Sequence, residues 1–158
     1  MNTLIVYASK YGTTEDCAKA VQAGLPGDVT LIDVNKLSAD IALDGYDTVI
    51  IGGSVYVGAV SKKLRAFCNE YLDQLSGKRV GIFLCCAQPK QMDDVLTANF
   101  PPALVKDVVA VANFGCEAKV DKLKMLDKMI IKAVTGGSYT DWHILPGNIA
   151  DFIRKISP

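Results

Sequence analysis

Short apolar runs that alternate with longer amphipathic segments are the feature that most limits how this chain can fold. Five runs are almost continuous in Val, Ile, Leu, Ala or Phe, as expected for strands buried on both faces of a sheet. The segments between them favour helices with one apolar face. The alternation predicts a parallel sheet covered by helices. The predicted strands are residues 3–8, 29–33, 48–52, 79–84 and 108–114, and the predicted helices are residues 14–25, 61–75, 92–99, 119–134 and 148–156.

The length and composition of the chain fit one packed domain. It has 158 residues, half of them hydrophobic, and no repeat or linker divides it. We therefore expect a single α/β domain over residues 1–158. Such a chain is typical of a dinucleotide-binding half or of a related doubly wound sheet, and in both the ligand binds beyond the carboxyl ends of the strands. Functional residues are therefore expected directly after each strand.

Charge and cysteine content exclude several classes of protein. Seventeen basic residues balance seventeen acidic ones, which argues against nucleic acid as the partner. The five cysteines have no zinc-binding spacing and predict reduced thiols in a cytoplasmic protein. The N-terminus has no signal-peptide pattern, and no apolar run approaches the ~20 residues of a membrane span. A single histidine, His143, predicts neither a metal centre nor a catalytic triad.

The first predicted strand leads into a turn that is rich in hydroxyl groups and opens a helix. Backbone N–H groups and the helix dipole at such a position favour an anion, and Gly12 permits close approach of the backbone. The turn lacks the glycine pattern of dinucleotide-binding and P-loop sites. It is either a phosphate site or an ordinary helix start with Thr13 or Thr14 as N-cap. This first loop comprises Ser9, Lys10, Tyr11, Gly12, Thr13 and Thr14.

Two further loops follow the third and fourth strands. Gly52 and Gly53, with Gly58 beyond them, suggest backbone that lies flat against a planar ligand. Tyr56 is the loop's only aromatic residue and either stacks on such a ligand or covers the core. The adjacent cysteines after the fourth strand are a redox pair or, more in keeping with the strain of vicinal disulfides, buried thiols. The second loop is Ser54, Val55, Tyr56, Val57 and Gly58, and the third loop is Cys85, Cys86, Ala87 and Gln88.

The first loop resembles the phosphate loop of flavodoxins, in which a turn rich in Ser and Thr ends in Gly-x-Thr-Glu. The resemblance covers nearly the whole chain and implies a three-layer sandwich with a parallel sheet in the order 2-1-3-4-5 and helices on both faces. It implies FMN as the cofactor, held by hydroxyls and amides with almost no cationic side chains. In this sequence the phosphate would be held by Ser9, Gly12, Thr13 and Thr14, with the N–H groups of Lys10 and Tyr11 assisting.

The second loop resembles the flavodoxin loop that contacts the flavin ring. In that family a backbone carbonyl flips there to accept a hydrogen bond from the reduced flavin, and the Val57–Gly58 peptide is the equivalent in this sequence. The third loop would supply amides to the pyrimidine end of the ring, but it lacks the aromatic residue that flavodoxins usually place there. The more open ring favours an FMN oxidoreductase, with no catalytic side chain beyond the flavin. An electron carrier between redox proteins stays the alternative.

The last forty residues resemble the flavodoxin-like, quinone-linked protoporphyrinogen oxidases. The resemblance rests on Met129 and the apolar residues after it, the pair Gly136-Gly137, the run from Tyr139 to Trp142, and Phe152. It implies a small-molecule reductant and a quinone or a redox protein as the acceptor. A shorter segment between Gly137 and Tyr139 departs from that family, so substrate contacts do not carry over.

The predicted helix from Lys119 to Val134 has a broad apolar face and five lysines on its polar side. A basic amphipathic helix is compatible with peripheral contact to a membrane surface, here the inner face of the membrane. The same pattern is typical of a packed helix whose lysines lie in water. Both interpretations stay open.

Overall fold

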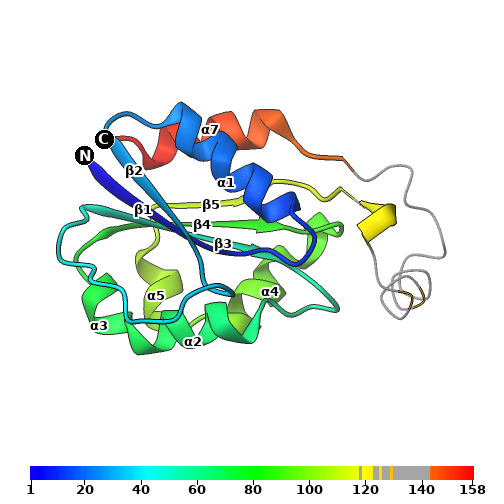
Figure 1. Ribbon diagram of the computed structural model, residues 1–158, viewed down its shortest axis with the longest axis horizontal. Helices are drawn as coiled ribbons and strands as arrows, with labels where there is room; N and C mark the ends of the chain where they lie inside the picture. The colour runs from blue at the N-terminus through cyan, green and yellow to red at the C-terminus, as the bar shows by residue number, and fades with distance from the viewer. Residues whose placement is uncertain (118, 123–124, 126–128, 130–142) are drawn as a thin grey trace.

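The computed structural model describes residues 1–117, 119–122, 125, 129 and 143–158 (Figure 1). Its strands form one parallel sheet in the order β2-β1-β3-β4-β5, which confirms the predicted topology. The chain runs outward from β1 in both directions, so the switch in strand order lies beside β1. The strands are β1 (Asn2–Ala8), β2 (Asp28–Asp33), β3 (Thr48–Ser54), β4 (Arg79–Cys85) and β5 (Ala110–Asn113).

Helices cover both faces of the sheet, as predicted (Figure 1). One face carries α1 (Thr13–Gly24) and α7 (Pro146–Ile156), which pack against each other as well as against the strands. The opposite face carries α2 (Lys62–Glu70), α3 (Leu72–Leu75), α4 (Met92–Asn99) and α5 (Pro102–Asp107). Two short 3-10 helices, η1 (Pro89–Gln91) and η2 (Val120–Lys122), lie in the connections after β4 and β5.

Alternate residues of β1 supply the two halves of the core. Leu4 and Val6 pack with residues of α2, α4 and α5, whereas Ile5 and Tyr7 pack with residues of α1 and α7. This alternation is the two-residue period of a strand buried on both faces. The apolar runs in the sequence are continuous because neither face of the sheet is exposed to water.

Two glycines expected to lie against a ligand are instead part of the core. A Cβ atom on Gly52 would lie 2.2 Å from Cζ of Phe83, and one on Gly53 would lie 2.9 Å from the Leu64 side chain. Both glycines are inside β3 and buried. The expectation of a flat ligand-facing backbone at these two positions was therefore wrong, because their missing side chains make room for neighbouring residues.

Several predicted boundaries differ from the observed ones. β5 is shorter than residues 108–114, because it lies at the sheet edge and pairs only with β4, from Gly81↔Ala110 to Leu84↔Asn113. The predicted helix at residues 61–75 divides at Tyr71 into α2 and α3. The short helices α5 and η1 were missed, since three to six residues are too few to reveal a helical period.

Most of the predicted helix at residues 119–134 lies outside the described residues. Its described positions are Lys119, η2, Met125 and Met129, and the two methionines are helical and exposed. Within the described ranges, none of the helices is long and apolar enough to cross a membrane.

Candidate cofactor site at the carboxyl edge of the sheet

The three loops predicted as a site meet at the carboxyl edge of the sheet. The Val55 N–H donates to the Cys85 carbonyl at 3.0 Å, which joins the second loop to the third. The Lys10 ammonium lies 4.7 Å from the centroid of the Tyr56 ring, which joins the first loop to the second. Tyr56 is half-buried and faces the first loop, so it does more than cover the core.

The first loop turns sharply at Gly12, which occupies the N-cap position of α1. Its φ of 96° lies in the left-handed region that favours glycine. The Gly12 N–H donates to Ser9 Oγ at 3.0 Å, and no side chain caps the helix. The alternative in which Thr13 or Thr14 is the N-cap is therefore wrong. The first N–H groups of α1 have no intrahelical acceptors and are left for an external acceptor.

The two threonines at the start of α1 differ in how their hydroxyl groups are used. Thr13 Oγ1 donates to the Glu117 carbonyl at 3.3 Å. Thr14 is only 1% exposed, and its hydroxyl makes no hydrogen bond of normal geometry within the described residues, although the Cys85 thiol lies near. A buried hydroxyl without a partner is unfavourable in an isolated protein. Thr14 therefore offers a hydroxyl donor at the start of α1 that the described residues do not use.

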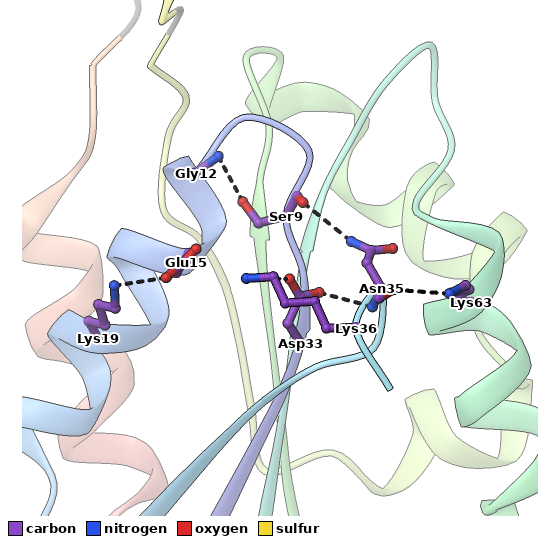
Figure 2. Close-up of polar contacts among 8 residues, drawn as sticks. All are labelled: Ser9, Gly12, Glu15, Lys19, Asp33, Asn35, Lys36 and Lys63. Atoms are coloured by element: carbon purple, nitrogen blue, oxygen red, sulfur yellow. Dashed lines mark hydrogen bonds and ion pairs between the residues drawn. The ribbon is translucent and has the colours of Figure 1, made fainter. Parts of the chain in front are cut away.

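The β2 side of the first loop is braced by a chain of polar contacts (Figure 2). Asn35 Nδ2 donates to the Ser9 carbonyl at 3.2 Å, and the Asn35 N–H donates to Asp33 Oδ1 at 3.0 Å. Lys63 of α2 donates to the Asn35 carbonyl at 3.1 Å. The loop is thus held from a neighbouring strand end and from a helix on the other face of the sheet. The sequence analysis missed Asn35 and Lys63.

The other side of the first loop is covered by the segment between β5 and η2. A Cβ atom built on Gly12 would lie 3.4 Å from Nζ of Lys119 and 3.9 Å from Nζ of Lys122. Lys119 forms an ion pair with Asp16 of α1, and this hydrogen bond raises the pKa of Lys119. Two ammonium groups from a distant part of the chain therefore lie beside the turn at Gly12. Neither was predicted as a site residue.

The second loop contains a tight turn with two residues in the left-handed region. Tyr56 and Ala59 exchange backbone hydrogen bonds of 2.8 and 3.1 Å. Between them, Val57 has a φ of 50° and Gly58 a φ of 73°. A β-branched residue is strained there, and Val57 is 65% exposed, so its side chain gains little burial in return.

The side chain of Asn99, at the end of α4, forms hydrogen bonds that fix this turn. Its amide is buried and donates to the Gly58 carbonyl at 2.9 Å and to the Val95 carbonyl at 2.8 Å. Its Oδ1 accepts from the Val60 N–H at 3.1 Å. The sequence analysis missed Asn99, because nothing in the local sequence indicates a partner 41 residues away.

The third loop is tied to β5 by another asparagine. Asn113 Oδ1 accepts from the Cys86 N–H at 3.1 Å, and its Nδ2 donates to the Cys86 carbonyl at 3.1 Å. The same Oδ1 accepts from the Gly115 N–H at 3.0 Å. The Cys86 amide is therefore used within the protein, which leaves Ala87 and Gln88 as the amides of this loop that could meet a ring.

The cysteines of the third loop are separate buried thiols, as expected. Cys85 Sγ lies 3.7 Å from Cys17 Sγ, and Cys86 Sγ donates to the Gln88 carbonyl at 3.4 Å. The contact with Cys17, together with burial, raises the pKa of Cys85, and burial raises the pKa of Cys86. Thiols with raised pKa values are poor nucleophiles at neutral pH.

A parallel sheet of this order, with helices on both faces, defines the flavodoxin-like fold. Residues 4–141 match the family model described as the flavodoxin domain. The chain belongs to the flavodoxin-domain family.

Solved structures are similar to this chain at the level of the fold. The flavodoxin of Fusobacterium nucleatum bound to flavin mononucleotide matches with a TM-score of 0.54 and 16% identity, over 98% of this chain and 96% of the other. An apo NADH:FMN oxidoreductase matches with a TM-score of 0.52 and 16% identity, over 93% and 92%. Rubredoxin oxygen:oxidoreductase from Desulfovibrio gigas has 18% identity and a TM-score of 0.48; the match covers 86% of this chain and only 36% of that protein.

These matches do not support the narrower resemblance to protoporphyrinogen oxidases. Much of the sequence on which that resemblance rests, residues 130–142, lies outside the described residues.

Proposed function

We propose that the chain binds one FMN at the carboxyl edge of its sheet and transfers electrons through it. The observation that carries this proposal is the start of α1, where the helix has no side-chain cap and the buried Thr14 hydroxyl has no partner among the described residues. A phosphate monoester offers the acceptor oxygens that such donors require. Membership of the flavodoxin-domain family supports the same cofactor.

The residues of the first loop fit a phosphate group in different ways. The hydroxyl groups of Ser9 and Thr14 and the N–H groups of Lys10 and Tyr11 are its proposed donors. Thr13 contributes its backbone N–H, because its hydroxyl already donates to Glu117. Gly12 shapes the turn, and its own N–H is held by Ser9. The contact to Asn35 fixes the loop before any ligand arrives, which lowers the entropy lost on binding.

The residues proposed to face the flavin ring are those of the second and third loops. Bound FMN supplies the redox chemistry, and the protein supplies binding and orientation. Asn99 and Asn113 fix the backbone of these two loops, so part-buried hydrogen bonds determine the surface that the loops offer to a planar ring. The third loop contains no aromatic side chain that would cover the ring.

We favour an oxidoreductase that takes a hydride equivalent from a small reduced molecule and passes electrons to a quinone or a redox protein. The lack of an aromatic cover in the third loop supports this form, since a substrate must reach the ring. The specific reaction that we propose for this oxidoreductase is of the protoporphyrinogen and quinone type. The order of residues from Met129 to Phe152 supports it. The alternative function is that of an electron carrier. The strained turn at Val57–Gly58 favours this alternative, because the turn resembles the flavin-contacting loop of flavodoxins.

A visible absorption titration with FMN, followed by stepwise reduction without oxygen, tests both parts. We expect uptake of one FMN per chain with a perturbed flavin spectrum. Reduction in a single two-electron step would support the oxidoreductase, whereas two separate one-electron steps would support the carrier. A protein that takes up no FMN would overturn the proposal.

A further inference from the structure

Two lysines outside the first loop lie against its turn. Nζ of Lys119 and Nζ of Lys122 are 3.4 and 3.9 Å from the position that a Cβ of Gly12 would occupy. The Lys122 N–H donates to the Lys119 carbonyl at 2.8 Å, so a single turn of η2 presents both side chains to the same place. We call Lys119 and Lys122 the lysine pair.

The position of the lysine pair is fixed by contacts with α1. Thr13 of α1 donates to the carbonyl of Glu117, two residues before Lys119, at 3.3 Å. Lys119 also pairs with Asp16, one turn into the helix, and its side chain is only 23% exposed. Two independent contacts therefore hold this segment of the chain across the start of α1.

The acidic side chains near the first loop give the lysine pair an electrostatic role. Glu15 and Asp16 suit the positive end of the helix dipole, but they would repel a phosphate dianion. Glu15 is paired with Lys19 at 2.8 Å, and Asp16 is paired with Lys119. Lys122 then adds a positive charge beside the turn at Gly12. These ion pairs therefore offset the acidic charges near the proposed anion site.

We propose that Lys119 and Lys122 bind the phosphate group of the cofactor beside the turn at Gly12. This inference rests on the proposed function, because it assigns further residues to the same site. It departs from the expectation of a phosphate held almost entirely by hydroxyls and amides. Charge-assisted hydrogen bonds are stronger than neutral ones and respond to salt. The lysine pair therefore makes the site selective for ligands that end in a phosphate monoester.

The test compares FMN with riboflavin, which has the same ring but no phosphate. The affinity of the apoprotein for each is measured by quenching of flavin fluorescence at low and high salt. The variant replaces both lysines by methionine, K119M/K122M, which keeps the apolar stems and removes both charges. The control K106M/K155M makes the same change in net charge at exposed positions on α5 and α7.

We expect K119M/K122M to bind FMN roughly a hundredfold more weakly, about tenfold for each charge-assisted bond. Its riboflavin affinity and the FMN affinity of the control should stay unchanged. The salt dependence of FMN binding should fall in the variant, and K119R/K122R should restore most of the affinity. An FMN affinity equal to that of the unchanged protein would overturn the inference while leaving the proposed function intact.

Inorganic phosphate gives a readout that does not depend on the flavin. It should raise the melting temperature of the apoprotein and have less effect on K119M/K122M, since a ligand that binds only the folded state stabilises it. If the unchanged protein binds no FMN but phosphate stabilises it through the lysine pair, the proposed function fails and the phosphate site stands. If phosphate stabilises both proteins equally, the lysine pair has no part in anion binding.

Discussion

The two ends of the candidate site use their polar groups in opposite ways. At the first loop, α1 has no side-chain cap and the buried Thr14 hydroxyl lacks a partner among the described residues. At the second and third loops, the side chains of Asn99 and Asn113 form hydrogen bonds with backbone groups of Gly58 and Cys86. Hydrogen-bond donors without a partner in the protein can bind a ligand and so contribute affinity. Donors and acceptors that are already paired within the protein instead fix the shape of the site. We infer that the first loop determines how tightly a ligand binds and that the other two determine how its ring is placed.

The largest loss of FMN affinity among the single substitutions is expected from Gly12→Asp. The substitution places a side chain at a φ of 96°, next to the proposed phosphate, and adds a negative charge there. We expect FMN affinity to fall at least about a hundredfold, near 3 kcal/mol or more, in fluorescence titrations.

Gly77→Asp is the matched control, because Gly77 has a φ of 88° in the turn before β4, at the amino edge of the sheet. It should lower the melting temperature by a similar amount and leave FMN affinity unchanged. If Gly12→Asp binds FMN as well as the control does, the first loop is not the phosphate site.

A second effect, on stability rather than affinity, is expected from Asn99→Leu. The change leaves the buried Val60 N–H without its partner and also removes the part-buried hydrogen bond to the Gly58 carbonyl. Loss of such a network should lower the free energy of unfolding by about 2–3 kcal/mol. Denaturant unfolding of the apoprotein measures it. If the substitution leaves the stability unchanged, Asn99 does not hold the second loop. The contrast between the first loop and the other two loops would then fail.

Thr14→Val is expected to change FMN affinity and the stability of the apoprotein in opposite directions. Removing a buried hydroxyl that has no partner is expected to stabilise the apoprotein by about 1 kcal/mol. The same change should weaken FMN binding about tenfold, since the hydroxyl is a proposed phosphate donor.

Thr3→Val is its control. Thr3 is also fully buried, and its hydroxyl likewise has no partner among the described residues, but it lies at the other end of β1. It should give the same gain in stability with no change in FMN affinity. Equal effects of the two substitutions on FMN binding would remove Thr14 from the site.

The fold was predictable to the extent that its signals are local. Strands buried on both faces appear as apolar runs, so the sheet and its order followed from the sequence and the resemblance. The first loop was predicted as a site because its hydroxyl residues and Gly12 lie within six consecutive positions. Asn99, Asn113 and Lys119 were missed because each acts on a residue far away in the chain, and a single polar residue at an element's end carries no such information.

Two buried thiols make the stability of the protein depend on pH. Burial raises the pKa of Cys116, beside the first loop, to about 11, and that of Cys68, in the core, to about 12. A thiol whose pKa is higher in the folded state stabilises the protein below its unfolded value near 9 and loses this contribution as the pH rises toward the folded value.

Between pH 8 and pH 10 the unchanged protein should therefore lose about 1 kcal/mol of stability through Cys116 alone. The loss measured by denaturant unfolding should be smaller by that amount in Cys116→Ala. An identical pH dependence in the two proteins would show that Cys116 ionises as it does in the unfolded chain.

The smallest effect is expected from Val57→Gly. Glycine relieves the strain at a φ of 50° but gains backbone entropy when unfolded, so the apoprotein should become more stable by only about 0.5 kcal/mol. FMN affinity should change less than about twofold, because the first loop carries the affinity. The reduction potential of the bound flavin is the more telling measurement: an easier turn at the Val57–Gly58 peptide should shift it, by about 20 mV per kcal/mol for two electrons. A large loss of affinity with no shift in potential would reverse the roles of the two ends, since the second loop would then determine binding and not the placement of the ring.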